Sequence, residues 1–154
     1  MTIGIEDILT PERALLNVAV TSKKKLLEFL AGFVTEQLPG STADDIFDRL
    51  LSRERLGSTG IGEGVAIPHC RLAGIDQAMG ALFTLKDPID FDAIDQRPVD
   101  LLFFLLVPEE ACDEHLGTLA KLAESFSQES CRAQLRSAQS DKDLLRIAQT
   151  VFGT

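Results

Sequence analysis

The stretch VDLLFFLLV, residues 99–107, predicts a strand at the centre of a covered sheet. After Asp100, every residue from Leu101 to Val107 is apolar, and such a continuous run is typical of a strand that is buried on both faces. Pro108 ends the strand because proline has no amide hydrogen. The run is far shorter than the roughly 20 apolar residues that cross a bilayer, so we expect no membrane insertion.

Other strands and helices alternate on both sides of this stretch. Further strands are expected over residues 14–20, 65–67 and 78–85. Helices are expected after Ser22, from Thr42 to about Arg55, from residue 113 to about 126 and after Ser140, where capping residues precede apolar residues at helical spacing. Strands interspersed with helices predict an α/β sandwich, a sheet with helices on both faces.

Composition limits the class of protein. With 154 residues and 45% hydrophobic residues, the chain is expected to form one domain, residues 1–154. Three cysteines without framework spacing favour a reducing compartment, and MTIGIEDIL lacks the regions of a signal peptide, so we expect a cytoplasmic protein. The net charge of −9 argues against nucleic acid as a partner, because phosphate binding needs clustered positive charge and Lys23–Lys25 is the basic cluster. An acidic surface favours a basic protein partner or simply solubility.

A glycine-rich segment, GSTGIGEGVAIPHCR, occupies residues 57–71. It is not a nucleotide P-loop, because Gly64 is followed by valine and alanine instead of lysine and a hydroxyl. It is not a dinucleotide fingerprint either, since it follows a helix and precedes a strand. The remaining interpretations are a flexible turn, or a loop that binds an anion through the backbone at Gly60, Gly62 and Gly64 and the hydroxyls of Ser58 and Thr59.

His69 is the candidate nucleophile. It follows Pro68 at the end of a short predicted strand, the edge where α/β folds place ligands. Neutral imidazole is a good nucleophile near pH 7, so it can accept a phosphoryl group and pass it on without a metal or cofactor. The alternative interpretation is a surface histidine that caps a turn.

Several segments together carry a family resemblance. RERLGSTGIGEGVAIPH, FDAIDQRPVDLLFFLLVPE, HLGTLAKLA and AQSDKDLL resemble the type-2 enzyme IIA domains of the bacterial phosphoenolpyruvate-dependent phosphotransferase system (PTS), and most of all their stand-alone nitrogen-related branch. The resemblance runs from EDILTPERALLNV to the C-terminal helix. It implies a mixed sheet with helices on both faces. One departure is Cys70, where relatives often have glycine.

The resemblance implies both a mechanism and a site. His69 would be phosphorylated by a histidine of a small carrier protein, HPr or its nitrogen-branch relative NPr, which enzyme I charges. Arg53 and His115 would complete the site. The protein would then be a regulator that binds target proteins according to its phosphorylation state. The alternative within the family is a sugar-specific, fructose- or mannitol-type IIA that passes phosphate to a IIB partner.

The residues themselves allow other interpretations of this site. Arg53, near the end of its helix, can hold anionic oxygens with its planar fork or can simply be an exposed helix-end charge. His115 precedes Leu119 by one helical turn, so it faces inward, as a hydrogen-bond donor or as a structural residue. A third interpretation is a zinc site of His69, Cys70, Cys112 and His115, although adjacent ligands fit poorly into one tetrahedron.

Overall fold

The computed structural model describes residues 8–110 and 113–152, and of residues 113–116 it describes only the backbone. The strands are β1 (Leu9–Val18), β2 (Gly60–Gly62), β3 (Val65–Ala66), β4 (His69–Leu72), β5 (Met79–Ile89) and β6 (Val99–Pro108). The helices are α2 (Lys23–Gln37), α3 (Ala43–Arg55), α4 (Asp113–Phe126), α5 (Glu129–Arg136) and α6 (Asp141–Phe152). The described helices include none that is long and apolar enough to cross a membrane.

The strands form one mixed sheet around β6. Their order is β1-β5-β6-β3-β2, and β4 also pairs with β6. β6 is antiparallel to β5 and parallel to β3 and β4, while β1 is parallel to β5. Residues 101–106 of β6 are fully buried. The central strand predicted from the apolar run, and the mixed sheet implied by the family resemblance, are both confirmed.

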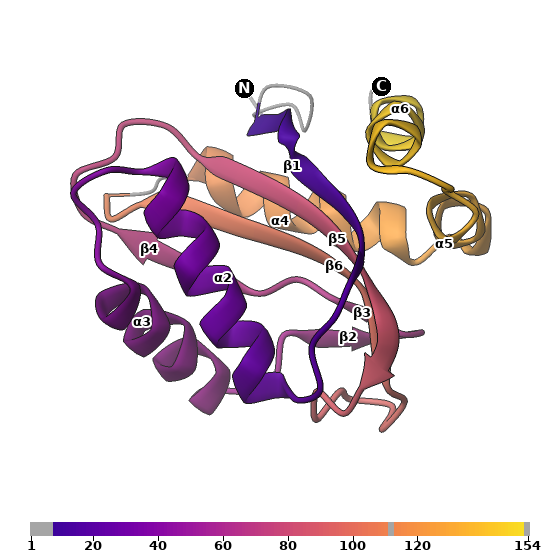
Figure 1. Ribbon diagram of the computed structural model, residues 1–154, viewed down its shortest axis with the longest axis horizontal. Coiled ribbons are helices and arrows are strands. Elements are labelled where there is room, and N and C mark those ends of the chain that lie inside the picture. The colour runs from indigo at the N-terminus through magenta and orange to yellow at the C-terminus, as the bar shows by residue number, and fades with distance from the viewer. Residues whose placement is uncertain (1–7, 111–112, 153–154) are drawn as a thin grey trace.

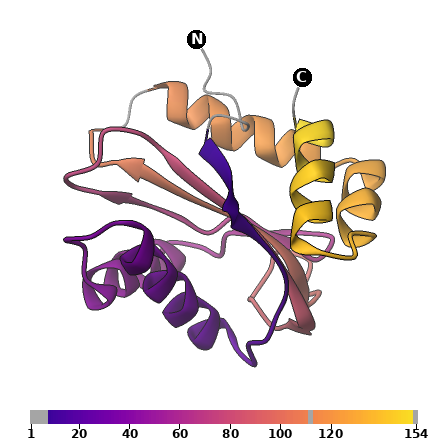
Figure 2. The same cartoon turned by 45° about the horizontal axis from the view of Figure 1, so that its top comes forward.

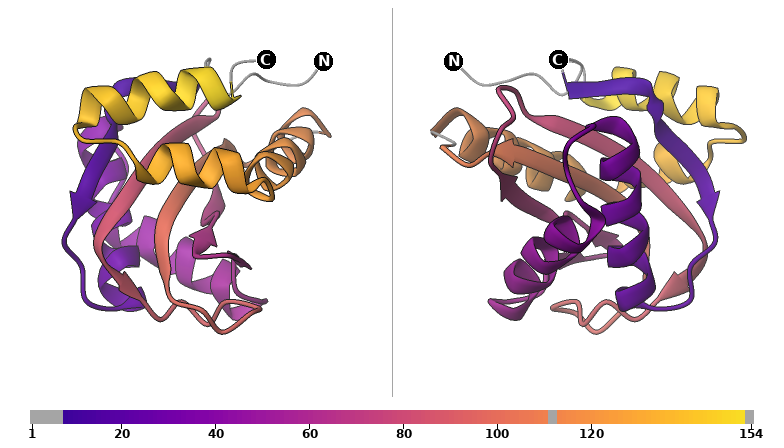
Figure 3. Two further views of the ribbon diagram at one scale, coloured as in Figure 1. Left: turned by 90° about the vertical axis from the view of Figure 1, so that its right-hand side faces the viewer. Right: turned by 60° about the vertical axis from the view of Figure 1, so that its left-hand side comes forward.

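Helices cover both faces of this sheet. α2 and α3 lie on one face, and α4, α5 and α6 lie on the other (Figures 1 and 2). The two views of Figure 3 show each helical layer in turn. The predicted caps are present, since Ser22 Oγ accepts the Lys25 amide, Thr42 Oγ1 the Asp45 amide and Ser140 Oγ the Asp143 amide. The α/β sandwich predicted from the sequence is therefore confirmed.

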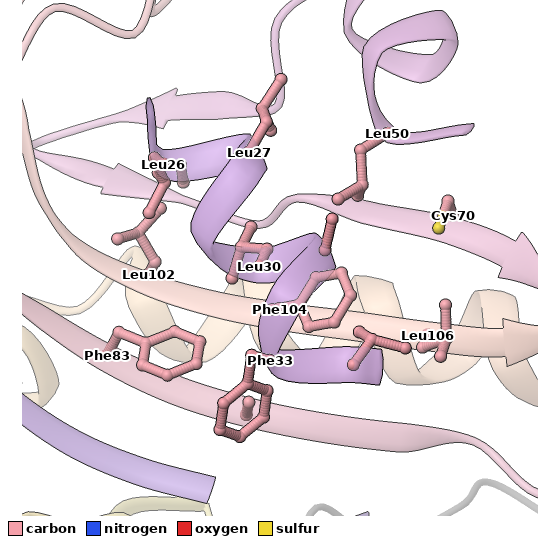
Figure 4. Packing of buried hydrophobic residues seen from close by; sticks show 14 of the residues in the cluster. Leu26, Leu27, Leu30, Phe33, Leu50, Cys70, Phe83, Leu102, Phe104 and Leu106 are labelled. Carbon is pink, nitrogen blue, oxygen red and sulfur yellow. The ribbon is translucent and has the colours of Figure 1, made fainter. Parts of the chain in front are cut away.

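Alternate side chains of β6 build two cores. Leu102, Phe104 and Leu106 pack towards α2 and α3, whereas Leu101, Phe103 and Leu105 belong to the cluster on the side of α4 to α6. This division follows from the two-residue period of a strand. Figure 4 shows side chains of α2 lying against Phe104 and its neighbours. Both cores are anchored on β6. They hold this strand in place, and the site lies beside it.

The edge beside β6 is interrupted at Ile67 and Pro68. β3 pairs with β6 at Leu101 and Leu102, and β4 pairs with it again from His69 opposite Leu105. β2 pairs with β3, and among the described strands β4 has β6 as its one partner. His69 therefore begins a strand whose outer edge is open, instead of ending a strand as the sequence predicted.

Five elements differ from the sequence prediction: β5 ends at Ile89, four residues later than predicted, and four others differ as follows. β1 begins at Leu9, five residues earlier than predicted, and pairs with β5 from Leu9 opposite Gly80. β2, β4 and α5 were not predicted; two are short strands, and α5 has eight residues and no side-chain cap. All four depend on tertiary packing more than on local sequence signals.

Candidate active site

The structure brings Arg53 and His69 together. Arg53 lies in the last turn of α3, and His69 is the first residue of β4. Nε of Arg53 donates a hydrogen bond to Nε2 of His69 over 3.2 Å. A second guanidinium nitrogen donates to the carbonyl of Gly57 over 2.8 Å, which fixes the side chain. A positive, planar donor group therefore lies directly beside the imidazole ring.

The other ring nitrogen of His69 fixes its tautomer. Nδ1 lies 2.8 Å from the carbonyl oxygen of Ile67. Because a carbonyl oxygen accepts hydrogen bonds and cannot donate one, the hydrogen-bond pattern assigns the proton to Nδ1. Nε2 then carries the lone pair, which agrees with its acceptance of the Arg53 hydrogen bond. Nε2 is thus the ring nitrogen whose lone pair would be available to a phosphoryl group.

The surroundings keep the His69 ring neutral. Burial lowers the pKa of His69 below its usual value of 6.5, and the positive charge of Arg53 lowers it further. The hydrogen bond to Ile67 and the charge of Glu54 oppose this shift. A ring that is neutral at pH 7 keeps its nucleophilic lone pair. Burial also raises the pKa of the neighbouring Cys70 thiol to about 12, so that thiol is not a competing nucleophile.

His69 and Arg53 line a groove of about 670 Å³ on the surface. Leu105, Val107 and Leu119 form its apolar part. Arg49, Arg53 and Arg71 supply positive charge, while Asp45, which pairs with Arg49, and Asp48 supply negative charge. Leu56, at its border, is 85% exposed. Such a groove can receive the surface of another protein and hold an anionic group next to Nε2 of His69.

The hydroxyls of Ser58 and Thr59, predicted to bind phosphate, are engaged within the loop. Ser58 Oγ donates to the carbonyl of Phe91 over 2.8 Å and accepts the amide of Gly60. Thr59 is buried, and both its hydroxyl and its amide donate to the carboxylate of Glu54. In this structure, both side chains hold the glycine-rich segment in place.

The three glycines permit close packing of this segment. A Cβ on Gly60 would lie 2.8 Å from Cβ of Ala93, and one on Gly64 would lie 2.5 Å from a guanidinium nitrogen of Arg136. Gly62 and Gly64 also have positive φ angles, of 103° and 77°. Among the described residues, those that line the His69 groove do not include residues 58–64. The structure therefore does not bring the glycines into the His69 groove, and phosphate binding by residues 58–64 stays a prediction.

Two residues proposed from the sequence fall outside the described side chains. His115 lies in the first turn of α4, where the structure describes the backbone alone, and Cys112 lies outside the described residues. Among the described side chains, no group of three or more histidines, cysteines or acidic residues could hold a metal ion. Cys70 itself is buried in the apolar cluster beneath α2 and α3. The role of His115 and the four-residue zinc site stay predictions.

Sequence reasoning missed Glu54 and Ile67. Glu54 is buried and contacts Thr59, while Ile67 offers its carbonyl to His69. The position of Glu54, directly after Arg53 and just before the glycine-rich segment, was an available signal. Ile67 acts through its backbone, which no residue type reveals.

Comparison with known proteins shows the family to which the chain belongs. The family described as phosphoenolpyruvate-dependent sugar phosphotransferase system, EIIA 2, matches residues 7–150. The chain belongs to this family and is a phosphotransferase component. Within the family it resembles nitrogen regulatory proteins: it is 49% identical over 149 residues to the one from Pseudomonas aeruginosa, with 97% of each chain covered.

A solved structure and a sugar-specific relative complete the comparison. The crystal structure of nitrogen regulatory protein IIA-Ntr from Neisseria meningitidis has a TM-score of 0.83 and 44% identity, covering 93% of this chain and 97% of that one. The fructose-specific EIIA component of Haloferax volcanii is 34% identical over 130 residues, 84% of each chain. The family resemblance identified from the sequence is confirmed, and the nitrogen-related branch is favoured over the sugar-specific one.

Proposed function

We propose that the chain, acting as a single domain, carries a phosphoryl group on Nε2 of His69 in a cytoplasmic, nitrogen-related PTS. The donor is a phosphohistidine of a small HPr- or NPr-type carrier protein. The hydrogen bond between Arg53 and His69 is the observation that carries this proposal, because it places a cation beside a neutral nucleophile. The higher identity to a nitrogen regulatory protein than to a fructose-specific component supports the nitrogen branch.

The transfer step is a displacement at phosphorus. The lone pair of Nε2 attacks, a new N–P bond forms, and the N–P bond in the donor breaks with its electron pair returning to the donor imidazole. Nδ1 of His69 keeps its proton, so the ring becomes a phosphorylated imidazolium. The charge of the phosphoryl oxygens is spread during transfer, and the guanidinium of Arg53 is placed to hold them.

The attached phosphate gives a physical basis for regulation. It adds about −1.5 to −2 charges to a groove lined by three arginines, two aspartates and apolar residues. A target protein that fits the unmodified groove then meets a different charge. We therefore expect the chain to bind target proteins according to its phosphorylation state.

The test is reconstitution. The protein is mixed with enzyme I, the carrier and phosphoenolpyruvate, and the phosphate is located by intact mass and ³¹P NMR. One phosphoryl group, labile in acid and stable in base, is expected on His69, and none on His69→Ala. Label on the alanine variant at the normal rate would overturn the site. A second arm adds a fructose- or mannitol-type IIB protein: rapid onward transfer to it would favour the sugar-specific alternative.

A further inference from the structure

An ion pair with a buried carboxylate lies behind the active site. Lys23 begins α2, a position where the helix dipole disfavours a cation. Its ammonium lies 3.0 Å from Oε1 of Glu54 and 4.5 Å from the centre of the Phe91 ring. The Glu54 side chain is 4% exposed and that of Lys23 is 19% exposed, and the ammonium also lies 3.8 Å from a carboxylate oxygen of Asp92. Because burying two charges is costly, such a pair is weak evidence for stability and invites a search for another role.

The carboxylate of Glu54 also holds Thr59. It accepts the Thr59 amide over 3.1 Å and the Thr59 hydroxyl over 2.5 Å. With the ammonium of Lys23, three donors therefore converge on one carboxylate. The start of the glycine-rich segment is thereby fixed to the last turn of α3.

From Thr59 the hydrogen bonds continue to His69. The Thr59 carbonyl accepts the amide of Ile67 over 2.9 Å, and the Ile67 carbonyl accepts Nδ1–H of His69 over 2.8 Å. Nε2 of His69 in turn accepts from Arg53, the residue before Glu54. The hydrogen bonds thus form a closed circuit: two consecutive residues of α3 control the two ring nitrogens, Arg53 directly and Glu54 through Thr59 and Ile67.

We propose that Glu54 is a positioning residue for phosphoryl transfer, which acts through Thr59 and Ile67 to hold His69 with Nδ1 protonated and Nε2 free. This inference rests on the proposed function, in which Nε2 of His69 accepts the phosphoryl group. Transfer needs this tautomer, since protonated Nε2 has no lone pair to attack phosphorus.

The same circuit favours the product. When Nε2 bonds to phosphorus and Nδ1 keeps its proton, the ring carries a positive charge. The Ile67 carbonyl then accepts a charge-assisted hydrogen bond, which is stronger than a neutral one. The negative charge of Glu54, which raises the pKa of His69, stabilises the same cationic ring.

The first experiment determines the tautomer and the pKa of the His69 ring in the unphosphorylated protein. The variant Glu54→Gln is combined with Lys23→Met, because Glu54 is the nearer carboxylate partner of Lys23 and only the contact with Asp92 over 3.8 Å would otherwise be left among the described ion pairs. Two-bond ¹⁵N–¹H correlations report the tautomer of His69, and a titration reports its pKa. We expect the Nε2–H tautomer to appear, because the carboxylate that holds Thr59 has been removed. A fall in the pKa of His69 is expected for Glu54→Gln alone, which removes the negative charge and leaves Lys23 in place. Asp143→Asn, which removes a carboxylate of α6 bonded to Arg146, is the control and should leave the ring unchanged.

The second experiment measures transfer. For the Glu54→Gln, Lys23→Met protein we expect a rate about tenfold lower, by analogy with partners that orient metal-bound histidines. Thr59→Val, which keeps the shape and loses the hydroxyl donor, should show a smaller loss, and Thr59→Ser should restore the rate. Thr59→Val also decides the matter if the double variant does not fold.

The two proposals fail differently. A normal tautomer and transfer rate in folded Glu54→Gln, Lys23→Met and Thr59→Val proteins would overturn the role of Glu54, even with lower melting temperatures. A wild-type protein that takes no phosphate on His69 would overturn the proposed function, whatever the state of the ring.

Discussion

The guanidinium of Arg53 donates a hydrogen bond to the lone pair of His69 that the proposed transfer uses. Its Nε lies 3.2 Å from Nε2, and its other contact, with the Gly57 carbonyl, keeps it in place. Arg53 must release Nε2 when phosphorus approaches, and the same group then lies next to the arriving phosphoryl oxygens. We therefore expect this residue to stabilise the resting ring before transfer and the phosphate after it.

Arg53→Lys tests this relationship. Lysine keeps the charge but loses the planar fork. It therefore cannot hold the Gly57 carbonyl at the same time as either Nε2 or the phosphoryl oxygens. We expect transfer to slow by about 10- to 100-fold, because a hydrogen bond to a charged group contributes about 1.5–3 kcal/mol. Rapid-quench transfer rates measure the effect. Arg55→Lys, on the exposed side of the same turn, is the control. Equal rates in both variants would make Arg53 a helix-end charge.

The lowered pKa of His69 predicts the pH dependence. Transfer should be level above pH 6.5 and should fall as the pH drops through the lowered pKa, because protonation removes the lone pair of Nε2. The folded protein binds this proton less readily than the unfolded chain does. The contribution of His69 to stability is therefore full above pH 6.5 and is lost as the pH falls to the lowered value. An NMR titration of the ring, with the pH dependence of unfolding for wild type and His69→Gln, checks both. A ring that titrates above 6.5 contradicts the prediction.

The variant Gly60→Ala tests whether Gly60 has a structural role or binds phosphate. The new Cβ would meet Cβ and Cα of Ala93 at 2.8 and 3.0 Å, so we expect about 1–3 kcal/mol of destabilisation from overpacking. Transfer by the folded fraction should be unchanged. Gly32→Ala, within α2 and with no atom within 4 Å of the added Cβ, is the matched control and should stabilise by about 0.5–1 kcal/mol. Chemical denaturation gives the free energies. A stable Gly60→Ala protein with slow transfer would show that Gly60 belongs to the phosphate-binding site.

The sequence predicted the elements that carry strong local signals. The apolar run of β6 and the cap at Thr42 before α3 placed the central strand and the helix that carries Arg53. β4, with the polar sequence HCRL, has no such signal, since its pairing with β6 defines it as a strand. α5 is short and uncapped, so packing decides whether it forms.

The site could be predicted as residue types but not as geometry. His69 was named from its place after Pro68 and Arg53 from the family resemblance. In the fold, Nε of Arg53 lies 3.2 Å from Nε2 of His69. The engagement of Ser58 and Thr59 depends on Phe91 and Glu54, and no local pattern links Ser58 to Phe91, 33 residues away. The circuit through Ile67 uses backbone atoms, which every residue has.

Cysteine variants test the zinc alternative. The Cys70 thiol is buried, and burial raises its pKa to about 12, so it is neither a nucleophile nor a ready metal ligand. Cys70→Ser should keep its transfer rate and lose about 1–3 kcal/mol of stability, because a hydroxyl enters an apolar cluster. Cys112→Ser should also transfer normally. Metal analysis of untagged protein accompanies these assays. Stoichiometric zinc that is lost in Cys112→Ser would support the metal site.

His115→Ala decides whether the second histidine of the chain belongs to the site. In α4, His115 comes one turn before Leu119, which lines the groove of His69, so helical spacing places both residues on one face. If His115 donates a hydrogen bond to the phosphoryl oxygens, the variant should fold and bind the carrier. Its transfer should then slow by up to about 100- to 1,000-fold, as for the loss of one preorganised oxyanion donor. His115→Asn, which keeps a donor, should recover part of the rate. Rapid-quench rates paired with thermal melts separate the roles, since normal transfer with a large fall in melting temperature would make His115 structural.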